Sequence, residues 1–443
     1  MNRIGTARLL AYSAPAVPIS MLTMPLIMFV PTFYAQELGL GLASVGLVFF
    51  LARAWDGIID PVAGYLSDKT RSRWGRRKPW VLAATPFLMV LTVLLCQPPE
   101  NVSGTYLFVV IMLFYVAWAA LQIPYQSWGA DLSDDYLERN RIVGYREGAL
   151  MAGVLVATGL PILILPEQDP SLREILRVFT WSVLVILPVT VLIALRGCGP
   201  GPAPRQDVPP LRDALSSVAR NRHFMRLLAG LFALWLGLHI YNACIIMVLD
   251  FIAKLPSSAF LEFVLAQFVV GVAFTPFIVK LANRFGKHRV LACSAIGVGA
   301  LLPLYFVIPP DAYWVVFGLF LLKGLVISPI WVLPTSIVAD AVDVGMLEGG
   351  GDQAGTYMAL YNLINKLALA LSVGIALPLL GLLGFDPAGE NGPSAIVDLG
   401  LVGLVLPGLV WLGAIAALWN YPVTREFHAD VRRQLAAGSS ATE

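Results

Sequence analysis

Charged residues are scarce in this chain of 443 residues. Asp, Glu, Lys and Arg make up only 13% of it, whereas 58% of its residues are hydrophobic. Soluble domains carry about 25% charged residues, so the composition argues against a set of soluble domains and favours one unit with many membrane spans. The formal net charge of +2 gives no indication of a nucleic-acid partner.

Paired cysteines and catalytic motifs are also missing. Cys96, Cys198, Cys244 and Cys293 stand singly in or beside apolar runs, so we expect all four to be small buried hydrophobic residues. The sequence has no phosphate-binding loop, no metal-spaced cluster of histidine and cysteine, and no nucleophile elbow. We therefore expect no enzymatic activity and no cofactor.

Long apolar runs are what the chain has in abundance. A membrane-spanning helix needs about 20 apolar residues. By this measure there are twelve candidate spans, at about 14–35, 40–65, 80–98, 105–130, 146–166, 175–196, 226–252, 259–281, 290–308, 313–338, 356–384 and 399–421. The first run lacks a small-residue cleavage site, which predicts a retained span and not a signal peptide.

A stretch rich in glycine and proline, 197–204, separates the sixth run from the seventh. We expect a six-helix half at 1–198, a cytoplasmic middle loop at 199–224, a second six-helix half at 225–423 and a cytoplasmic tail at 424–443. The basic sequence at 69–78 is echoed at 282–289 in the second half. Paired six-span halves are typical of alternating-access transporters.

Basic residues indicate the orientation of these spans. Six of the ten residues from Lys69 to Lys78 are Lys or Arg, and further arginines follow spans four, six, eight and twelve. Cytoplasmic loops are enriched in Lys and Arg. We therefore expect a multi-pass protein of a bacterial-type inner (plasma) membrane with both termini in the cytoplasm.

Three charged residues fall inside the second apolar run. Arg53, Asp56 and Asp60 are three and four residues apart, so on a helix they share one face. Charges at this depth are costly and usually mark an ion or substrate pathway. Two neighbouring carboxylates can bind Na⁺ through their oxygens or share a proton. A structural salt bridge with Arg53 is the alternative interpretation.

The motif Arg53-x-Trp-Asp-x-x-x-Asp-Pro-x-x-Gly, followed by Arg71-x-Arg-Trp-Gly-Arg-Arg-Lys-Pro-Trp, resembles the glycoside–pentoside–hexuronide:cation symporters of the major facilitator superfamily. The likeness extends over essentially the whole chain through Ile123-Pro-Tyr, Tyr145-Arg146, the segment 339–345 and Lys366. The resemblance implies a sodium or proton site on Asp56 and Asp60, which Lys366 approaches from the other half.

The chain departs from the melibiose-permease pattern at three positions. Ser20 and Gln122 stand where sugar-contacting acids are expected, and Ile59 stands where an asparagine is expected. Sugar recognition normally uses carboxylates that accept hydroxyl hydrogen bonds. Two substrate hypotheses follow: the glycoside or hexuronide that the family implies, and an anionic or zwitterionic amphipathic solute such as a lysophospholipid, which Lys323 would favour. Animal lysolipid symporters resemble the same family.

Further polar residues inside the apolar runs are candidates for the substrate path. They are Lys323 and Lys366 near mid-span, His239 and Asn242 in span seven, and Gln122, Tyr125, Gln126 and Trp128 around Pro124. The alternatives are snorkelling or surface positions for the lysines, a helix-to-helix hydrogen bond for His239 and Asn242, and an interface anchor for Trp128.

Four charged residues fall at cytoplasmic helix ends: Asp68, Arg146, Asp340 and Asp343. We expect them to form gating charge pairs between the halves, with capping of loops as the alternative. The whole pattern predicts an all-α membrane protein with twelve transmembrane helices in a major facilitator fold. We expect it to be monomeric in the lipid bilayer and to act as a cation-coupled symporter of a small organic solute. A non-transporting membrane receptor is the alternative from another class.

Overall fold

The computed structural model is helical throughout the part of the chain that it describes. That part comprises residues 4–99, 101–133, 136–165, 170–198, 220–256, 258–345, 347, 354–423, 427, 430, 431, 433 and 434. Within it, twelve helical segments are long and apolar enough to cross a membrane. The expected all-α fold with twelve spans is thereby confirmed.

The described residues fall into two compact units. The first draws on Met1–Pro204, Pro256–Leu265 and Leu377–Gly392, and the second on Arg205–Leu255, Ala266–Ala376 and Pro393–Glu443. Six spans come from the first two hundred residues. The first span consists of α1 (Thr6–Ser13), α2 (Ala16–Met24), the π-helical segment η1 (Pro25–Phe29) and α3 (Val30–Gln36). The other five are α4 (Leu42–Lys69), α5 (Lys78–Cys96), α6 (Gly104–Asp131), α7 (Tyr136–Ile164) and α8 (Leu172–Gly197).

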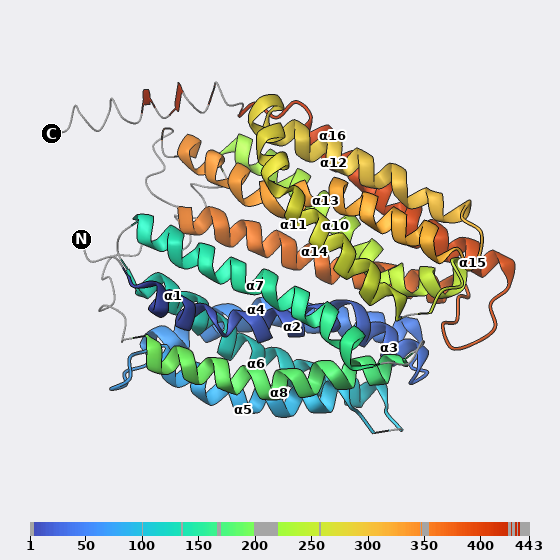
Figure 1. The fold of residues 1–443 in the computed structure, drawn as a ribbon, viewed down its shortest axis with the longest axis horizontal. Helices are drawn as coiled ribbons and strands as arrows, with labels where there is room; N and C mark the ends of the chain where they lie inside the picture. Colours follow the sequence, from blue (N-terminus) through green and yellow to red (C-terminus); the bar gives the residue numbers. More distant parts are fainter. Residues whose placement is uncertain are drawn as a thin grey trace. The chain divides into compact units, whose positions relative to one another are not determined.

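The remaining six spans lie further along the chain. They are α10 (Arg222–Met247) with η2 (Val248–Ile252), α11 (Ala259–Phe285), α12 (Lys287–Leu301) with η3 (Leu302–Phe306), α13 (Tyr313–Gly345), α14 (Ala354–Leu382), and α15 (Pro393–Gly400) with η5 (Leu401–Val405) and α16 (Leu406–Leu418). In the first unit α5 packs against α6 and α8, as the neighbouring ribbons in Figure 1 show. In the second unit α16 packs against α10 and α12.

Side-chain caps fix where several of these helices begin. Ser171 accepts a hydrogen bond from the backbone N–H of Glu174, while the Glu174 carboxylate accepts one from the backbone N–H of Ser171 at 2.9 Å. This capping box satisfies two donors that a helix start would otherwise leave unpaired. Asn221 caps α10 in the same way through the N–H of Phe224. Polar residues at the ends of apolar runs therefore set the helix boundaries.

Close approach of helices depends on small residues at defined positions. At Gly153 of α7, an added Cβ would meet the carbonyl of Val17 and the hydroxyl of Ser20. At Gly237 of α10 it would meet Trp411, whose indole N–H donates to the Leu234 carbonyl at 2.9 Å. Glycine lets the backbones of α2 and α7, and of α10 and α16, come close enough to pack.

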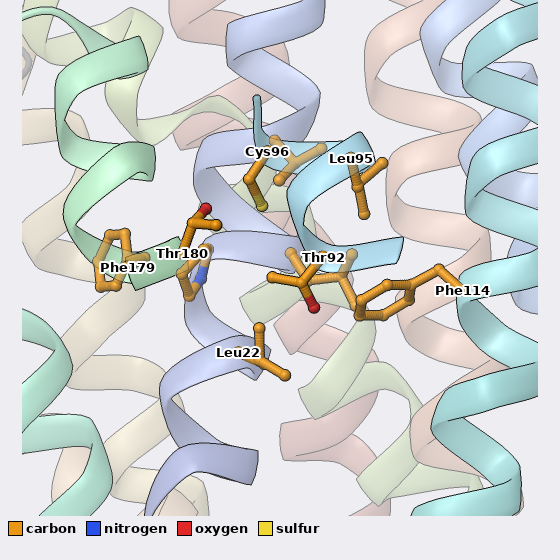
Figure 2. Close-up of a pocket in the computed structure, with 10 residues that line it drawn as sticks. Leu22, Thr92, Leu95, Cys96, Phe114, Phe179 and Thr180 are labelled. Carbon is orange, nitrogen blue, oxygen red and sulfur yellow. The ribbon is translucent and has the colours of Figure 1, made fainter. Parts of the chain in front are cut away.

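The first span is interrupted by its π-helical segment beside Pro25. Figure 2 shows a small void next to this segment, ringed by Leu22, Thr92, Phe114, Thr180 and other residues. Its volume is about 10 Å³, which is close to the minimum for one water molecule. Both threonine hydroxyls already donate to carbonyls of their own helices. The void is therefore a packing defect beside the π-helical segment and not a ligand site.

Candidate cation and substrate site

The acids of α4 lie in different environments. Asp56 is 1% exposed, whereas Asp60 is half-buried. One Asp56 oxygen lies 3.9 Å from the Arg53 guanidinium, and that guanidinium stacks over the ring of Tyr115 at 4.8 Å. A buried carboxylate loses its hydration, so it needs compensation by a cation or by hydrogen bonds. The Arg53–Asp56 distance is long for a hydrogen-bonded pair, which makes this a loose ion pair.

The polar group of α6 divides between two faces of the helix. Tyr125 and Trp128 are buried against α1: the Tyr125 hydroxyl donates to the Tyr12 carbonyl at 2.9 Å, and the two tyrosine rings stack at 5.1 Å. Trp128 meets the Tyr12 ring edge-on. By contrast Gln122 is half-buried and Gln126 is exposed. Tyr125 and Trp128 therefore pack the interior of the unit, and a substrate role stays a prediction only.

Ser20 connects α2 to α7. Its side chain is buried, and its hydroxyl lies 2.6 Å from the Leu150 carbonyl and 3.3 Å from the Val17 carbonyl. The hydroxyl hydrogen is therefore donated to a backbone carbonyl of the same unit. The family resemblance led us to compare this position with a sugar-contacting acid, and the residue here has no carboxylate. This position consequently supplies no strong acceptor for a sugar hydroxyl.

An open groove of about 670 Å³ runs between α1–α2 and α7 in the first unit. Most of its lining is small or apolar, with one cation, Arg141, and one phenol, Tyr145. The Arg141 guanidinium also pairs with Glu138 at 2.7 Å. The sequence reasoning did not single out this groove. The signal that could have found it is the spacing of Gly144, Gly148 and Ala152, four residues apart along one face of α7.

In the second unit, Lys323 of α13 is enclosed by aromatic rings. It is 2% exposed, and its ammonium donates to the Tyr241 hydroxyl and lies 3.7 Å from the Phe320 ring centroid. No ion pair joins Lys323 to a carboxylate within the described part of the chain. The position is interior, as the mid-span prediction requires, and not at the surface. The ammonium is stabilised by cation–π contacts and one hydroxyl.

His239 and its neighbours connect α10 to α14. The His239 Nε2 atom lies 3.0 Å from the Asn365 side-chain oxygen, and the His239 ring stacks on Trp235. This is the helix-to-helix hydrogen bond that the sequence allowed as an alternative. Asn242 and Lys366 are both half-buried.

Two of the predicted gating residues, Asp340 and Arg146, have partners within their own units. Asp340 of α13 accepts two hydrogen bonds from Lys287 of α12, at 2.6 and 2.8 Å, and Arg146 pairs with Glu147 at 2.6 Å. Burial, and then the Asp340 charge, raises the pKa of the Tyr421 hydroxyl, so this group stays neutral. Asp343 is half-buried. The side chain of Asp68 lies outside the described residues. Charge pairs between the halves stay a prediction.

The basic loop between α4 and α5 is pinned to neighbouring helix ends. Arg76 and Arg77 both donate to Asp131 at the end of α6, at distances from 2.6 to 3.3 Å. Lys78 donates to the carbonyls of Leu195 and Cys198 at the end of α8. A cation at a helix C-terminus is favoured by the helix dipole. These contacts attach the loop to the ends of α6 and α8.

Residues 11–425 match the protein family described as MFS/sugar transport protein. The chain belongs to this family of major facilitator transporters. It is thus a secondary transporter in a multi-pass membrane fold, and not an enzyme. The resemblance to glycoside–pentoside–hexuronide symporters is confirmed.

Relatives within the MFS/sugar transport family have diverse names. The chain is 24% identical to a glucuronide carrier protein homolog of Escherichia coli, covering 90% of this chain and 88% of that one. It is 22% identical to a sodium-dependent lysophosphatidylcholine symporter of Gallus gallus, covering 98% and 90%. The crystal structure of the nucleoside transporter NupG has a TM-score of 0.65 at 14% identity, covering 94% of this chain and 100% of that one. The last likeness shows the fold alone.

Proposed function

We propose that this transporter is a cation-coupled symporter in which Asp56 and Asp60 bind Na⁺ or carry a proton. The observation that supports this most strongly is the position of Asp56, a carboxylate that is 1% exposed inside a candidate span and lies 3.9 Å from the Arg53 guanidinium, a distance that is long for a hydrogen-bonded pair. Asp60 follows one turn later on the same face. An ion that binds between two such carboxylates gains charge-assisted contacts that are stronger than in water.

The transported solute in this proposal is an organic molecule with an anionic group, either a hexuronide or an amphipathic anion or zwitterion. The groove between α1–α2 and α7 supports this class, because it combines an apolar lining with the Arg141 cation. Ser20 and Gln122 supply no carboxylate for a neutral sugar. The names of relatives include one solute of each kind: one relative is a glucuronide carrier protein homolog, and another is a sodium-dependent lysophosphatidylcholine symporter. A transporter family gives no support to the receptor alternative.

We also propose the membrane in which the protein lies, its orientation there and its oligomeric state. The concentration of Lys and Arg at 69–78 supports a cytoplasmic position for that loop and for both termini in an inner (plasma) membrane. The protein would act as a monomer, with the bilayer and its solute as partners and with no cofactor beyond the coupling ion.

Asp56→Asn and Asp60→Asn test the cation site. The amide keeps the side-chain volume but removes the charge, so each variant in proteoliposomes should equilibrate solute without concentrating it against a gradient. Glu390→Gln, in an exposed loop, is the matched control and should transport as the unchanged protein does. If both aspartate variants still accumulate solute, the cation site lies elsewhere.

Arg141→Gln tests the substrate class. Thermal stabilisation of the purified protein by a glucuronide or by lysophosphatidylcholine should exceed that by a neutral galactoside, because the guanidinium offers charge-assisted hydrogen bonds. The variant should lose about tenfold in affinity for the anionic ligand, whereas Lys280→Gln on α11 should not. Stabilisation by the galactoside that equals or exceeds stabilisation by the anionic ligands, with no loss in the Arg141→Gln variant for any of them, would return the chain to neutral-sugar transport.

A further inference from the structure

A second pocket, of about 470 Å³, lies in the first unit where the end of α8 meets the start of α5. It is separate from the groove of α1–α2 and α7, with which it shares no lining residue. Its polar lining consists of three cations, Arg73, Lys78 and Arg196, and its apolar lining includes Trp74, Leu82 and Leu192. The lining contains no carboxylate.

The cations of this pocket differ from their neighbours in the same loop. Arg76 and Arg77 share the carboxylate of Asp131. Arg73 makes only a ring contact, with Trp74, and within the described part of the chain neither Arg73 nor Arg196 forms an ion pair. Both are exposed. The pocket therefore presents positive charge that no described acidic side chain neutralises.

The third cation of the pocket, Lys78, is held in position by backbone carbonyls. Its ammonium donates to the Leu195 carbonyl at 2.9 Å and to the Cys198 carbonyl at 2.5 Å, and it lies 5.4 Å from the Trp128 ring centroid. These contacts hold the ammonium where α8 ends. An ammonium has three N–H donors, and two are used by the carbonyls, so one remains for an anion in the pocket.

The apolar surface beside the pocket continues along α8 into the candidate span. Val185, Val189 and Leu192 are exposed, and their spacing of four and three residues places them on one face. Phe87 and Val90 of α5 are exposed as well. An aromatic residue such as the exposed Trp74 is typical of the boundary between headgroups and acyl chains. The pocket thus adjoins a surface suited to hydrocarbon.

We propose that this pocket binds the headgroup of an anionic phospholipid. The lipid phosphate faces Arg73, Lys78 and Arg196, and one acyl chain lies along Val185, Val189 and Leu192 of α8. Basic pockets between transmembrane helices favour anionic lipid headgroups, and guanidinium groups form charge-assisted bonds with phosphate oxygens. A free soluble phosphate would use the cations but would gain nothing from the apolar face.

The test is lipid binding by the full-length purified protein, measured by native mass spectrometry with phosphatidylglycerol, phosphatidylcholine or inorganic phosphate. The Arg73→Gln/Arg196→Gln double variant should bind phosphatidylglycerol at least about tenfold more weakly than the unchanged protein. Arg71→Gln/Arg284→Gln removes the same charge outside the pocket and should change the affinity less than about twofold. Binding of phosphatidylcholine should not differ among the three proteins.

Two results would overturn the proposal. One is equal phosphatidylglycerol affinity in the double variant and the unchanged protein. The other is displacement of the lipid by inorganic phosphate at millimolar concentration, which would assign the cations to a soluble anion. If the double variant is not folded by circular dichroism, Arg73→Gln and Arg196→Gln are measured singly, and each is expected to weaken binding. The result does not depend on whether Asp56 and Asp60 couple transport.

Discussion

Asp131, near the end of α6, holds two arginines of the α4–α5 loop. It receives hydrogen bonds from Arg76 and Arg77, and Arg77 in turn donates to the Ser67 hydroxyl at 2.6 Å. Arg77 is only 7% exposed. Removal of one member of a buried charge cluster leaves the others without compensation. The attachment of the α4–α5 loop to the end of α6 therefore depends on this one carboxylate.

Asp131→Asn should lower the free energy of unfolding by roughly 3 kcal/mol, because two guanidinium groups lose their shared anion. The measurement is the midpoint of thermal unfolding of the purified protein in detergent. Asp430→Asn is the control, since Asp430 pairs with Arg433 where both side chains are exposed and exposed pairs contribute little. Equal shifts for the two variants would contradict a bracing role for Asp131.

The burial of a charged side chain could be predicted where the charge interrupts an apolar run. Asp56 and Lys323 are examples, because a charged side chain of either sign is rare inside an apolar run, and both are buried. The burial of Tyr125 and Trp128 could not be predicted, because a sequence does not say which face of α6 meets α1. One expectation was wrong: Cys293 is exposed, although the other three cysteines are buried. An apolar run gives no information on which side of a helix faces its neighbours.

The helices themselves were predictable from hydropathy, but their details were not. All twelve spans occur in the described residues, because an apolar run of sufficient length specifies a helix. The first span begins at Thr6 and not near residue 14, since Leu9 and Tyr12 are buried as α1 packs against α7 and α8. The sequence analysis did not predict the π-helical segments at Pro25–Phe29, Val248–Ile252 and Leu401–Val405.

Two glycines of α7 should respond in opposite directions to the same change. Gly153→Ala should lower the unfolding temperature, because its Cβ would meet the Val17 carbonyl and separate α7 from α2. Gly144→Ala should raise it slightly, because its Cβ meets nothing within 4 Å and alanine is the better helix former by about 1 kcal/mol. Thermal unfolding of both variants checks this. Destabilisation of equal size would show that helix propensity and packing at these positions are not as described.

At the scale of the whole molecule, a division into six-span halves is the arrangement that alternating access requires, and it stays a prediction. Each unit contains its own internal ion pairs, such as Arg76–Asp131 in the first and Lys287–Asp340 in the second. Such pairs attach helices and loops within one unit to each other. The family and the fold follow from the sequence as a whole. The coupling ion and the solute stay proposals, because they depend on a few side chains such as Asp56, Asp60, Ser20 and Gln122.

Cation-coupled symport can be measured as accumulation of a solute that is driven by an imposed ion gradient. Purified protein in proteoliposomes is supplied with a labelled glucuronide or lysophosphatidylcholine, and a Na⁺ or H⁺ gradient is imposed across the membrane. If the protein is a cation-coupled symporter, one of these gradients raises the internal concentration of one solute above the external concentration. An ionophore for that ion then abolishes the excess. Equal concentrations on both sides under every gradient would contradict cation-coupled symport.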